Sequence, residues 1–443
     1  MKNSQKIFNF KSTKIKNLIF IILIVAFFSI LYLYKLNSIP TNLTGDEMSY
    51  LKVVYQALYG PQFLNPFQLM EDHTKTVFNF YWMGLWIKIF GLNNTVFAMR
   101  FAISTVSIGA LIVFYLLLKN RSNNFTAFST TILLGTSVWF MNFSRSGWFN
   151  LVSVFFGLLM IYFFEKALKD KSLWFFLLSG FIGGLCLYSY LSGYIFPASA
   201  FTFLMFSVIL GKDKISKLLH TVFYFSGFLI PAIPLIIMAF KMKNDYLLRP
   251  DVVFAFNKAQ PFIHTFLIQL TDVLKGLVLL DGGVIGKSFE NPRYFPIHQS
   301  AVDPIIRTLF ISGLLFYTYK FFKKPYFNIW ILIFIITLGT VGLMTVDSPN
   351  LARTIPILPC IYFLSGVIIF NAYETFKKTI NQKVILALFV ILTFLIAANN
   401  IHSYFKWAQD DQTAAYRYPF VSYENFPSWQ KYQIILAKQG ILQ

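Results

Sequence analysis

The sequence predicts an all-α polytopic membrane protein, with about eleven transmembrane helices and interfacial helices in its external loops. Of its 443 residues 56% are hydrophobic and 19% aromatic. Only 13% are charged, which is about half the usual share for a soluble protein. A soluble chain of this length would need a charged surface over two or three domains. The composition therefore excludes a soluble protein.

Eleven windows of about 20 apolar residues predict helices that cross the membrane. We do not expect the first to be a cleaved signal peptide, because its apolar run from Leu18 to Tyr34 is too long and no small-residue cleavage site follows. The predicted spans are 18–36, 100–118, 126–141, 149–164, 174–190, 194–210, 219–240, 305–319, 327–345, 354–371 and 384–400.

The charged residues divide between the two sides of the predicted bundle. Half of the 38 Lys and Arg residues lie in six short segments on one side, where only four of the 18 acidic residues lie. This bias is typical of cytoplasmic loops, so we expect the N-terminus in the cytoplasm and the C-terminus outside. The net charge of +20 then reflects topology, and nucleic acid is not an expected partner. The basic residues in question are Lys2, Lys6, Lys11, Lys14, Lys16, Lys119, Arg121, Lys166, Lys169, Lys171, Lys212, Lys214, Lys217, Lys320, Lys323, Lys324, Lys377, Lys378 and Lys383.

The long connections all fall on the predicted external side. They are 37–99, 241–304 and the aromatic-rich C-terminal tail 401–443. We therefore divide the chain into a transmembrane module, 1–400, and this tail, for which a small interfacial helix or cap is expected. The polar chemistry of the protein is expected on the external face.

The first external segment carries the clearest local pattern. Thr44 to Tyr50 reads Thr-Gly-Asp-Glu-Met-Ser-Tyr, and apolar residues then recur at helical spacing until a Gly-Pro pair. We predict a short amphipathic helix on the membrane surface, with Asp46 and Glu47 in its first turn. Two interpretations stay open. Either the acids carry chemistry, or Thr44 and Glu47 form a capping box and the acids stabilise the helix dipole.

A second polar cluster, Glu71-Asp72-His73, precedes the aromatic stretch 77–90. That stretch contains Lys88 and is too short to span the membrane, so we predict a second interfacial helix. The three polar residues could be metal ligands. Because sequential neighbours rarely all face one ion, a solvated turn is the preferred interpretation.

These features resemble the GT-C membrane glycosyltransferases, and in particular the bacterial branch related to protein O-mannosyltransferases and to the lipid A aminoarabinose transferase. The likeness in layout covers roughly 18–400, and the Asp46-Glu47 pair that opens the first external loop is its most specific element. The other matching elements are Lys75 before the aromatic stretch, Arg100 at the start of the second span, Ser144-Arg145 before the fourth span, and Arg353-Thr354-Ile355-Pro356-Ile357-Leu358-Pro359 opening the tenth.

The sequence departs from this family pattern at two places. Thr76-Val77 stands where relatives carry Pro residues after Lys75. Asn150 stands where many relatives carry an acid just after the Ser-Arg pair of the second external loop. The second departure puts in doubt a further catalytic acid or metal ligand at that place.

The resemblance implies a glycosyltransferase that moves a sugar from a polyprenyl-phosphate donor to an acceptor hydroxyl on the external face. One displacement with one base predicts inversion at the anomeric carbon. A phosphate leaving group needs cations to hold it rather than an acid to protonate it. The candidates for donor-phosphate binding all lie near the outer boundary: Lys75, Arg100, Arg145 and Arg353. The alternative for each is that it only reaches towards lipid headgroups.

The attacking hydroxyl must also lose a proton, for which a carboxylate within hydrogen-bond reach is the simplest base. Asp46 is the candidate base, and Glu47 would orient it, bind the acceptor or help hold a cation. Tyr50, His73 and His298 are candidates for donor or acceptor contacts. No cofactor is predicted, although a divalent cation is left open.

By the same resemblance the protein is expected in the bacterial cytoplasmic membrane. Its expected partners are a polyprenyl-phosphate-linked sugar, an acceptor that is a glycan, lipid or protein, and membrane lipids.

A transporter or flippase for a lipid-linked saccharide is the main alternative. Such a protein is expected to show charges inside the membrane, broken helices in matching positions and internal symmetry. Two proline pairs, Pro231/Pro234 and Pro356/Pro359, are predicted to interrupt spans, but neither symmetry nor a mid-span acid accompanies them. A non-catalytic assembly subunit is a third alternative, in which Asp46 would tolerate substitution.

Overall fold

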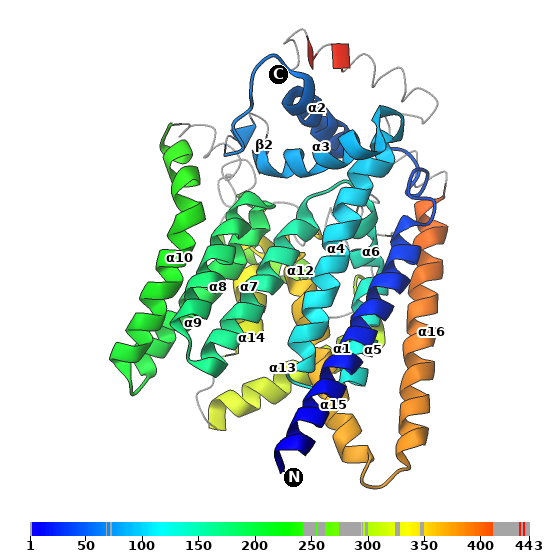
Figure 1. The fold of residues 1–443 in the computed structure, drawn as a ribbon, viewed down its shortest axis with the longest axis vertical. Helices are drawn as coiled ribbons and strands as arrows, with labels where there is room; N and C mark the ends of the chain where they lie inside the picture. Colours follow the sequence, from blue (N-terminus) through cyan, green and yellow to red (C-terminus); the bar gives the residue numbers. More distant parts are fainter. Residues whose placement is uncertain are drawn as a thin grey trace.

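The structure is a computed structural model that describes residues 2–67, 69–70, 73–241, 254–255, 262–273, 294, 296, 300–323, 328–345, 350–410, 434–435 and 437–438. Within these residues the regular secondary structure consists of α-helices and short helical turns, apart from one small hairpin and an isolated bridge between Phe254 and Thr345 (Figure 1). The predicted all-α polytopic class is confirmed. Most of the second long external segment and of the C-terminal tail lies outside the described residues.

Eight helices in the described part of the chain are long and apolar enough to cross a membrane, and each coincides with one of the predicted spans. Their large exposed side chains are mostly Ile, Leu, Val and Phe, as expected of helices that face lipid. These helices are α1 (Lys2–Leu33), α4 (Thr95–Lys119), α7 (Asn150–Asp170), α9 (Ile195–Leu210), α10 (Lys214–Lys241), α13 (Pro304–Lys323), α15 (Ile357–Phe376) and α16 (Gln382–Ala408). Single 3₁₀ turns precede α4 and α9, at Leu92–Asn94 and Leu191–Tyr194.

The other three predicted spans are not single uninterrupted α-helices. The window 126–141 divides at Ser137, which has an extended backbone (φ −60°, ψ 137°) and whose hydroxyl caps the next helix at the Phe140 N–H. The prediction of one continuous helix there is wrong. The helices in the three windows are α5 (Asn124–Thr136) with α6 (Val138–Arg145), α8 (Leu173–Leu185) with the 3₁₀ turn η2 (Cys186–Tyr188), and α14 (Ile329–Thr337) with the π-helical turn η6 (Leu338–Gly342).

Two shorter helices, α2 (Gly45–Tyr59) and α3 (Phe78–Phe90), lie together at one end of the bundle (Figure 1). Both were predicted, α2 from the helical spacing of its apolar residues and α3 from an apolar stretch too short to span the membrane. Between them β1 (Leu69–Met70) pairs antiparallel with β2 (His73–Thr76), and the turn predicted at Glu71-Asp72-His73 falls between these strands and on the first residue of β2. Glu71 and Asp72 lie outside the described residues. A further helix, α12 (Phe262–Val273), belongs to the second external segment.

Glycines bring α8 and α10 into backbone contact. A methyl group at Gly180 would overlap the carbonyl oxygen of Tyr224, and one at Gly227 would overlap that of Leu177. Small residues at such an interface let membrane helices approach closely, so that van der Waals packing holds them together. The α8–α10 pair is therefore held by shape rather than by charge.

The proline pairs do not break the helices as predicted. Pro231 and Pro234 both lie inside the continuous helix α10. Membrane helices tolerate proline because neighbouring groups and small local adjustments compensate for the missing hydrogen bonds. Pro356 is the N-cap of α15 and Pro359 lies in its first turn, where proline fits the helix geometry. The prediction that these residues interrupt spans is wrong.

Candidate active site

Thr44 and Glu47 close the first turn of α2 in a reciprocal pair of hydrogen bonds. The Glu47 N–H donates to Thr44 Oγ1 at 3.0 Å, and the Thr44 N–H donates to Glu47 Oε2 at 3.0 Å. The Thr44 hydroxyl also donates to Oε2 at 3.1 Å, and Trp148 Nε1 donates to Thr44 Oγ1 at 3.2 Å. The predicted capping box is present.

The second carboxylate oxygen of Glu47 binds two donors from other parts of the chain. Oε1 accepts from Arg100 Nε at 3.3 Å and from the Gly147 N–H at 3.0 Å. Both the Glu47 and the Arg100 side chains are 0% exposed. A carboxylate is stable in such a place only when it is paired and hydrogen-bonded, as Glu47 is. Its burial leaves it able to orient the turn but not to contact a ligand.

Asp46, by contrast, remains partly exposed in the same turn. Among the described residues its carboxylate has no hydrogen-bond or ion-pair partner. It lies next to the N-terminal end of α2, where the helix dipole favours a negative charge. Of the two acids, Asp46 is the one available to a substrate.

Arg100, near the start of α4, holds the link between α1 and α2 (residues 34–44). Its Nη1 donates to the carbonyl oxygens of Leu36 and Pro40 at 3.1 and 2.9 Å, and its Nη2 donates to that of Asn42 at 2.7 Å. Together with its contact to Glu47, these bonds join the link, α2 and α4.

Arg145, the last residue of α6, binds both the end of α1 and the same link. It is fully buried, and the rings of Tyr404 and Phe405 on α16 lie 5.8 and 4.9 Å from its guanidinium carbon. Its Nη1 and Nη2 atoms donate at 2.6–3.0 Å to four backbone carbonyls, those of Leu31, Tyr32, Tyr34 and Ile39.

Two of those carbonyls belong to the last turn of α1, where a helix has no partners of its own. The end of α16 adds to the same assembly, because the Thr41 N–H donates to the Ala408 carbonyl at 3.1 Å. The helix α16 thus continues past residue 400, the predicted end of the module. Arg100 and Arg145 were predicted to bind a donor phosphate, but both guanidinium groups are shielded and bound to backbone carbonyls. The structure therefore places them as supports of the α1–α2 link.

Arg353 differs from these two arginines because it is partly exposed. It lies in the loop 350–356, directly before α15. The Asn350 side chain accepts from the N–H groups of Ala352 and Arg353 at 3.1 and 3.2 Å, which fixes the backbone of the loop. Of the predicted donor-phosphate ligands with a described side chain, Arg353 is the one with an accessible surface.

The other predicted site residues are less exposed or less fully described. Tyr50 is buried, with its ring stacked on Phe149 at 4.9 Å and edge-on to Phe80 at 5.6 Å. His73 and Lys75 lie in β2, but the description covers only their backbone. His298 lies outside the described residues.

Sequence reasoning missed the connection between α6 and α7, residues 146–149. Gly147 binds Glu47, Trp148 binds Thr44, and Phe149 stacks on Tyr50. The next residue, Asn150, donates from Nδ2 to the Ala352 carbonyl at 2.9 Å. Four consecutive residues thus join the acid-bearing helix α2 to the Arg353 loop. The Gly-Trp pair after Ser144-Arg145 was the available signal, but nothing local indicates its partners.

An apolar groove of about 510 Å³ lies beside this site. Helix α3 lines it with Phe78, Asn79, Tyr81, Trp82 and Leu85, and α4 and α7 complete it with Val106, Val152, Phe155 and Phe156, together with Pro66. The other face of α3 carries Phe80, which contacts Tyr50. Helix α3 therefore separates the groove from the aromatic cluster beneath α2.

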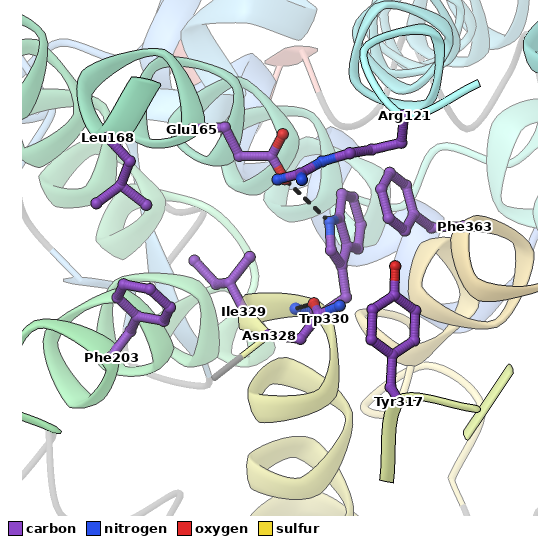
Figure 2. Close-up of a pocket in the computed structure, with 9 residues that line it drawn as sticks. All are labelled: Arg121, Glu165, Leu168, Phe203, Tyr317, Asn328, Ile329, Trp330 and Phe363. Carbon is purple, nitrogen blue, oxygen red and sulfur yellow. Dashed lines mark hydrogen bonds and ion pairs between the residues drawn. The ribbon is translucent and has the colours of Figure 1, made fainter. Parts of the chain in front are cut away.

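A second, smaller pocket of about 40 Å³ lies near the opposite ends of α4 and α7 (Figure 2). There the Glu165 carboxylate accepts from Trp330 Nε1 at 3.3 Å and lies 3.6 Å from Arg121 Nη2. Arg121 lies two residues beyond Lys119, the end of α4. Lys119 is 19 positions from Arg100, which corresponds to about 28 Å along the helix, so the pocket is far from the candidate site. This pocket has room for a few water molecules only, and it is not part of the candidate site.

No group of three or more His, Cys, Asp or Glu side chains in the described part of the chain could hold a metal ion. The involvement of a divalent cation stays an open prediction.

Comparison with known proteins finds one family model and several solved structures that this chain resembles. Residues 73–238 match the family model of the dolichyl-phosphate-mannose-protein mannosyltransferases. A comparison with curated protein sequences gives no match.

Two solved structures share the fold. The oligosaccharyltransferase of Archaeoglobus fulgidus in its apo form is 14% identical, with a TM-score of 0.53 over 91% of this chain and 56% of its own. The ArnT of Cupriavidus metallidurans bound to undecaprenyl phosphate is 12% identical, with a TM-score of 0.54 over 95% of this chain and 76% of its own. This chain thus spans little more than half the length of the oligosaccharyltransferase. This chain thus shares the fold of these two enzymes, and its residues 73–238 resemble the mannosyltransferase family model.

Proposed function

We propose that this protein transfers a sugar from a polyprenyl-phosphate donor to an acceptor hydroxyl, with Asp46 as the general base. The observation that carries the proposal is the division of the acid pair at the start of α2. Glu47 is buried and binds four donors, whereas the neighbouring Asp46 is partly exposed and has no partner among the described residues. A turn fixed so firmly around one carboxylate holds the other in a defined place.

The donor class is supported by the comparisons. The matching family model is that of dolichyl-phosphate-mannose-protein mannosyltransferases, and the ArnT structure holds undecaprenyl phosphate. Both names describe a sugar or a phosphate on a long isoprenoid chain. The apolar groove between α3, α4 and α7 is a suitable place for part of such a chain, because its walls are almost entirely aromatic and aliphatic.

The phosphate of the donor requires cations at the outer end of the groove. Arg353 is the proposed ligand, since it is partly exposed and its loop is joined to α7. Lys75, in the strand before α3, is a second proposed ligand. Arg100 and Arg145 hold the α1–α2 link and so position Asp46 without touching the donor.

The proposed reaction is a single displacement. The acceptor oxygen forms a bond to the anomeric carbon as the bond from that carbon to the phosphate oxygen breaks. The hydroxyl proton passes to the Asp46 carboxylate, and the polyprenyl phosphate leaves as an anion held by Arg353 and Lys75. Because the acceptor oxygen attacks from the side opposite the departing phosphate, this single displacement inverts the configuration at the anomeric carbon.

The location of the site follows the predicted topology. With the N-terminus in the cytoplasm, α2 and α3 lie on the external side of a bacterial cytoplasmic membrane, and a glycan, lipid or protein is the acceptor there. Any divalent cation would act in addition to the two basic side chains.

The test is a transfer assay with purified protein in liposomes. The protein receives a polyprenyl-phosphate sugar labelled in the sugar, together with an extract of envelope glycans, lipids and proteins. The proposal expects labelled acceptor and free polyprenyl phosphate in equal amounts, with inverted configuration by NMR. Movement of intact labelled donor across the liposome membrane without transfer would instead support the flippase alternative and contradict the enzyme.

A further inference from the structure

The loop before α15 is fixed at two consecutive carbonyl groups by side chains of α6 and α7. Trp139 Nε1 donates to the Leu351 carbonyl at 3.1 Å, and Asn150 Nδ2 donates to the Ala352 carbonyl at 2.9 Å. Trp139 is fully buried and Asn150 is 3% exposed. Water therefore cannot replace either hydrogen bond, and each is stronger than a hydrogen bond at the protein surface.

The N–H groups of the same loop are also occupied. Asn350 Oδ1 accepts from Ala352 and Arg353, and the Asn350 carbonyl accepts from the N–H groups of Arg353 and Thr354 at 3.0 and 2.9 Å. With donors and acceptors bound on both sides, the backbone of Arg353 has one defined position. The direction in which its side chain leaves the loop is therefore set by these contacts.

We infer that Asn150 is a positioning residue that holds Arg353 in place for the donor phosphate. The inference rests on the proposed function, because it takes Arg353 as a ligand of that phosphate. Asn150 is the first residue of α7 and does not use its side chain to cap that helix. It reaches across to the loop instead, over 202 positions of sequence.

The position of Asn150 also relates the phosphate ligand to the base. Gly147, which binds the Glu47 carboxylate, lies only three residues before Asn150, so their Cα atoms are at most about 11 Å apart. One short segment thus fixes both α2, which carries Asp46, and the loop that carries Arg353. A displacement of this segment would change the distance between base and leaving group.

The chemistry of the contact requires an N–H donor at position 150. An aspartate has almost the same shape as asparagine but offers only acceptors, so its carboxylate would face the Ala352 carbonyl without a proton between them. Asn150→Asp is therefore the sharpest variant, because it changes the hydrogen bond and keeps the volume. Ser153→Ala is the matched control, since among the described residues the Ser153 hydroxyl in the same turn bonds only to the Asn150 carbonyl.

The experiment measures the Kd of undecaprenyl phosphate for purified protein in detergent, by intrinsic tryptophan fluorescence, alongside the temperature of thermal unfolding. The variants are Asn150→Asp, Asn150→Ala, Ser153→Ala, Arg353→Ala and the double variant Asn150→Ala/Arg353→Ala. We expect both Asn150 variants to weaken binding by about three- to tenfold, as the loss of one buried hydrogen bond implies. Ser153→Ala should bind like the wild type.

The double variant separates positioning from a general structural effect. If Asn150 acts through Arg353, then removing Asn150 adds nothing once Arg353 is gone, and the double variant binds like Arg353→Ala. Additive losses, or a lower unfolding temperature with unchanged Kd, would overturn the inference. If the Asn150 variants are too unstable to purify, the cycle is run with Trp139→Phe, which removes the adjacent bond and predicts the same lack of additivity.

The result that would contradict the proposed function differs from the result that would contradict only the role of Asn150. A wild-type protein that neither binds undecaprenyl phosphate nor transfers sugar overturns the proposed function, and this inference with it. A wild type that does both, with a Kd that responds to Arg353→Ala but not to Asn150→Asp, overturns only the role of Asn150. If neither substitution changes the Kd, the assignment of Arg353 is also wrong.

Discussion

Glu47 Oε1 lies 3.3 Å from Arg100 Nε, and both side chains are completely shielded from solvent. The pair joins α2 to α4 and, through three more bonds of Arg100, fixes the link that leads from α1. Removing either partner of a buried ion pair leaves the other charge buried without compensation, which destabilises the folded protein. The stability of the whole α2 end of the bundle should respond to this pair.

The first prediction concerns Glu47 itself. Glu47→Ala should lower the free energy of unfolding by about 3–5 kcal/mol, because it leaves Arg100 and the Gly147 N–H without a carboxylate. The measurement is thermal unfolding in detergent. The control is Glu374→Gln, which removes an exposed ion pair with Lys377 and should change stability by at most about 1 kcal/mol. Equal effects of the two substitutions would contradict the role assigned to Glu47.

The second prediction contrasts two arginines. Arg145→Lys should lower the free energy of unfolding by at least about 2 kcal/mol, because an ammonium group has too few N–H donors to replace the planar guanidinium at four carbonyls. Arg353→Lys should leave the unfolding temperature nearly unchanged and raise the KM for the donor. Thermal unfolding and donor kinetics on the same preparations check both. A stable Arg145→Lys protein with a raised donor KM would mean that Arg145 binds the phosphate after all.

The third prediction tests the apolar groove. Leu85 lines the groove and is 47% exposed, so Leu85→Trp should narrow it and raise the KM for a long-chain donor several-fold. A donor with a short isoprenoid chain should be unaffected. Ile89→Trp is the matched control, since Ile89 lies on the same helix, is 58% exposed and does not line the groove. Identical kinetics of both variants with both donors would place the lipid chain elsewhere.

The fourth prediction concerns the contact between α8 and α10. Gly180→Leu should strongly reduce the yield of folded protein, because the new side chain would overlap the backbone of Tyr224. Gly339→Ala should be tolerated, since in the described part of the chain no atom outside the local helix backbone lies within 4 Å of the added methyl group. The comparison is made by size-exclusion chromatography and thermal unfolding after purification. Normal folding of Gly180→Leu would show that these helices are not in backbone contact.

Much of the fold could be predicted because the membrane imposes long apolar runs, and these are visible in the sequence. The same reliance on apolar runs explains why the break in the span 126–141 was not predicted. The window 126–141 is apolar enough to be a span, but Ser137 ends one helix and caps the next, and a single serine in an apolar run gives no warning. For the proline pairs the sequence predicted a break that is absent. Packing against neighbouring helices compensates for prolines that would break an isolated helix.

The candidate site was predictable where its signals are local. The capping box at Thr44 and Glu47 is a four-residue pattern, and the structure shows that it accounts for Glu47 but leaves Asp46 available. The sequence also identifies Arg100 and Arg145 as cations near the boundary. Their partners are backbone carbonyls more than 50 residues away, and a carbonyl is present at every position, so no pattern indicates which ones they bind. Asn150 binds over a still longer separation for the same reason.

The fifth prediction, and the most direct test of the account, is the initial rate of sugar transfer by Asp46→Asn protein, measured with labelled polyprenyl-phosphate sugar. The substitution keeps the shape of the side chain and removes its basicity. The rate should fall by about 10²–10⁴-fold, the usual contribution of a general base, with unchanged Kd for undecaprenyl phosphate and unchanged unfolding temperature. Asp170→Asn, an exposed acid at the other end of α7, should transfer at the wild-type rate. Full transfer by Asp46→Asn would contradict the proposed mechanism.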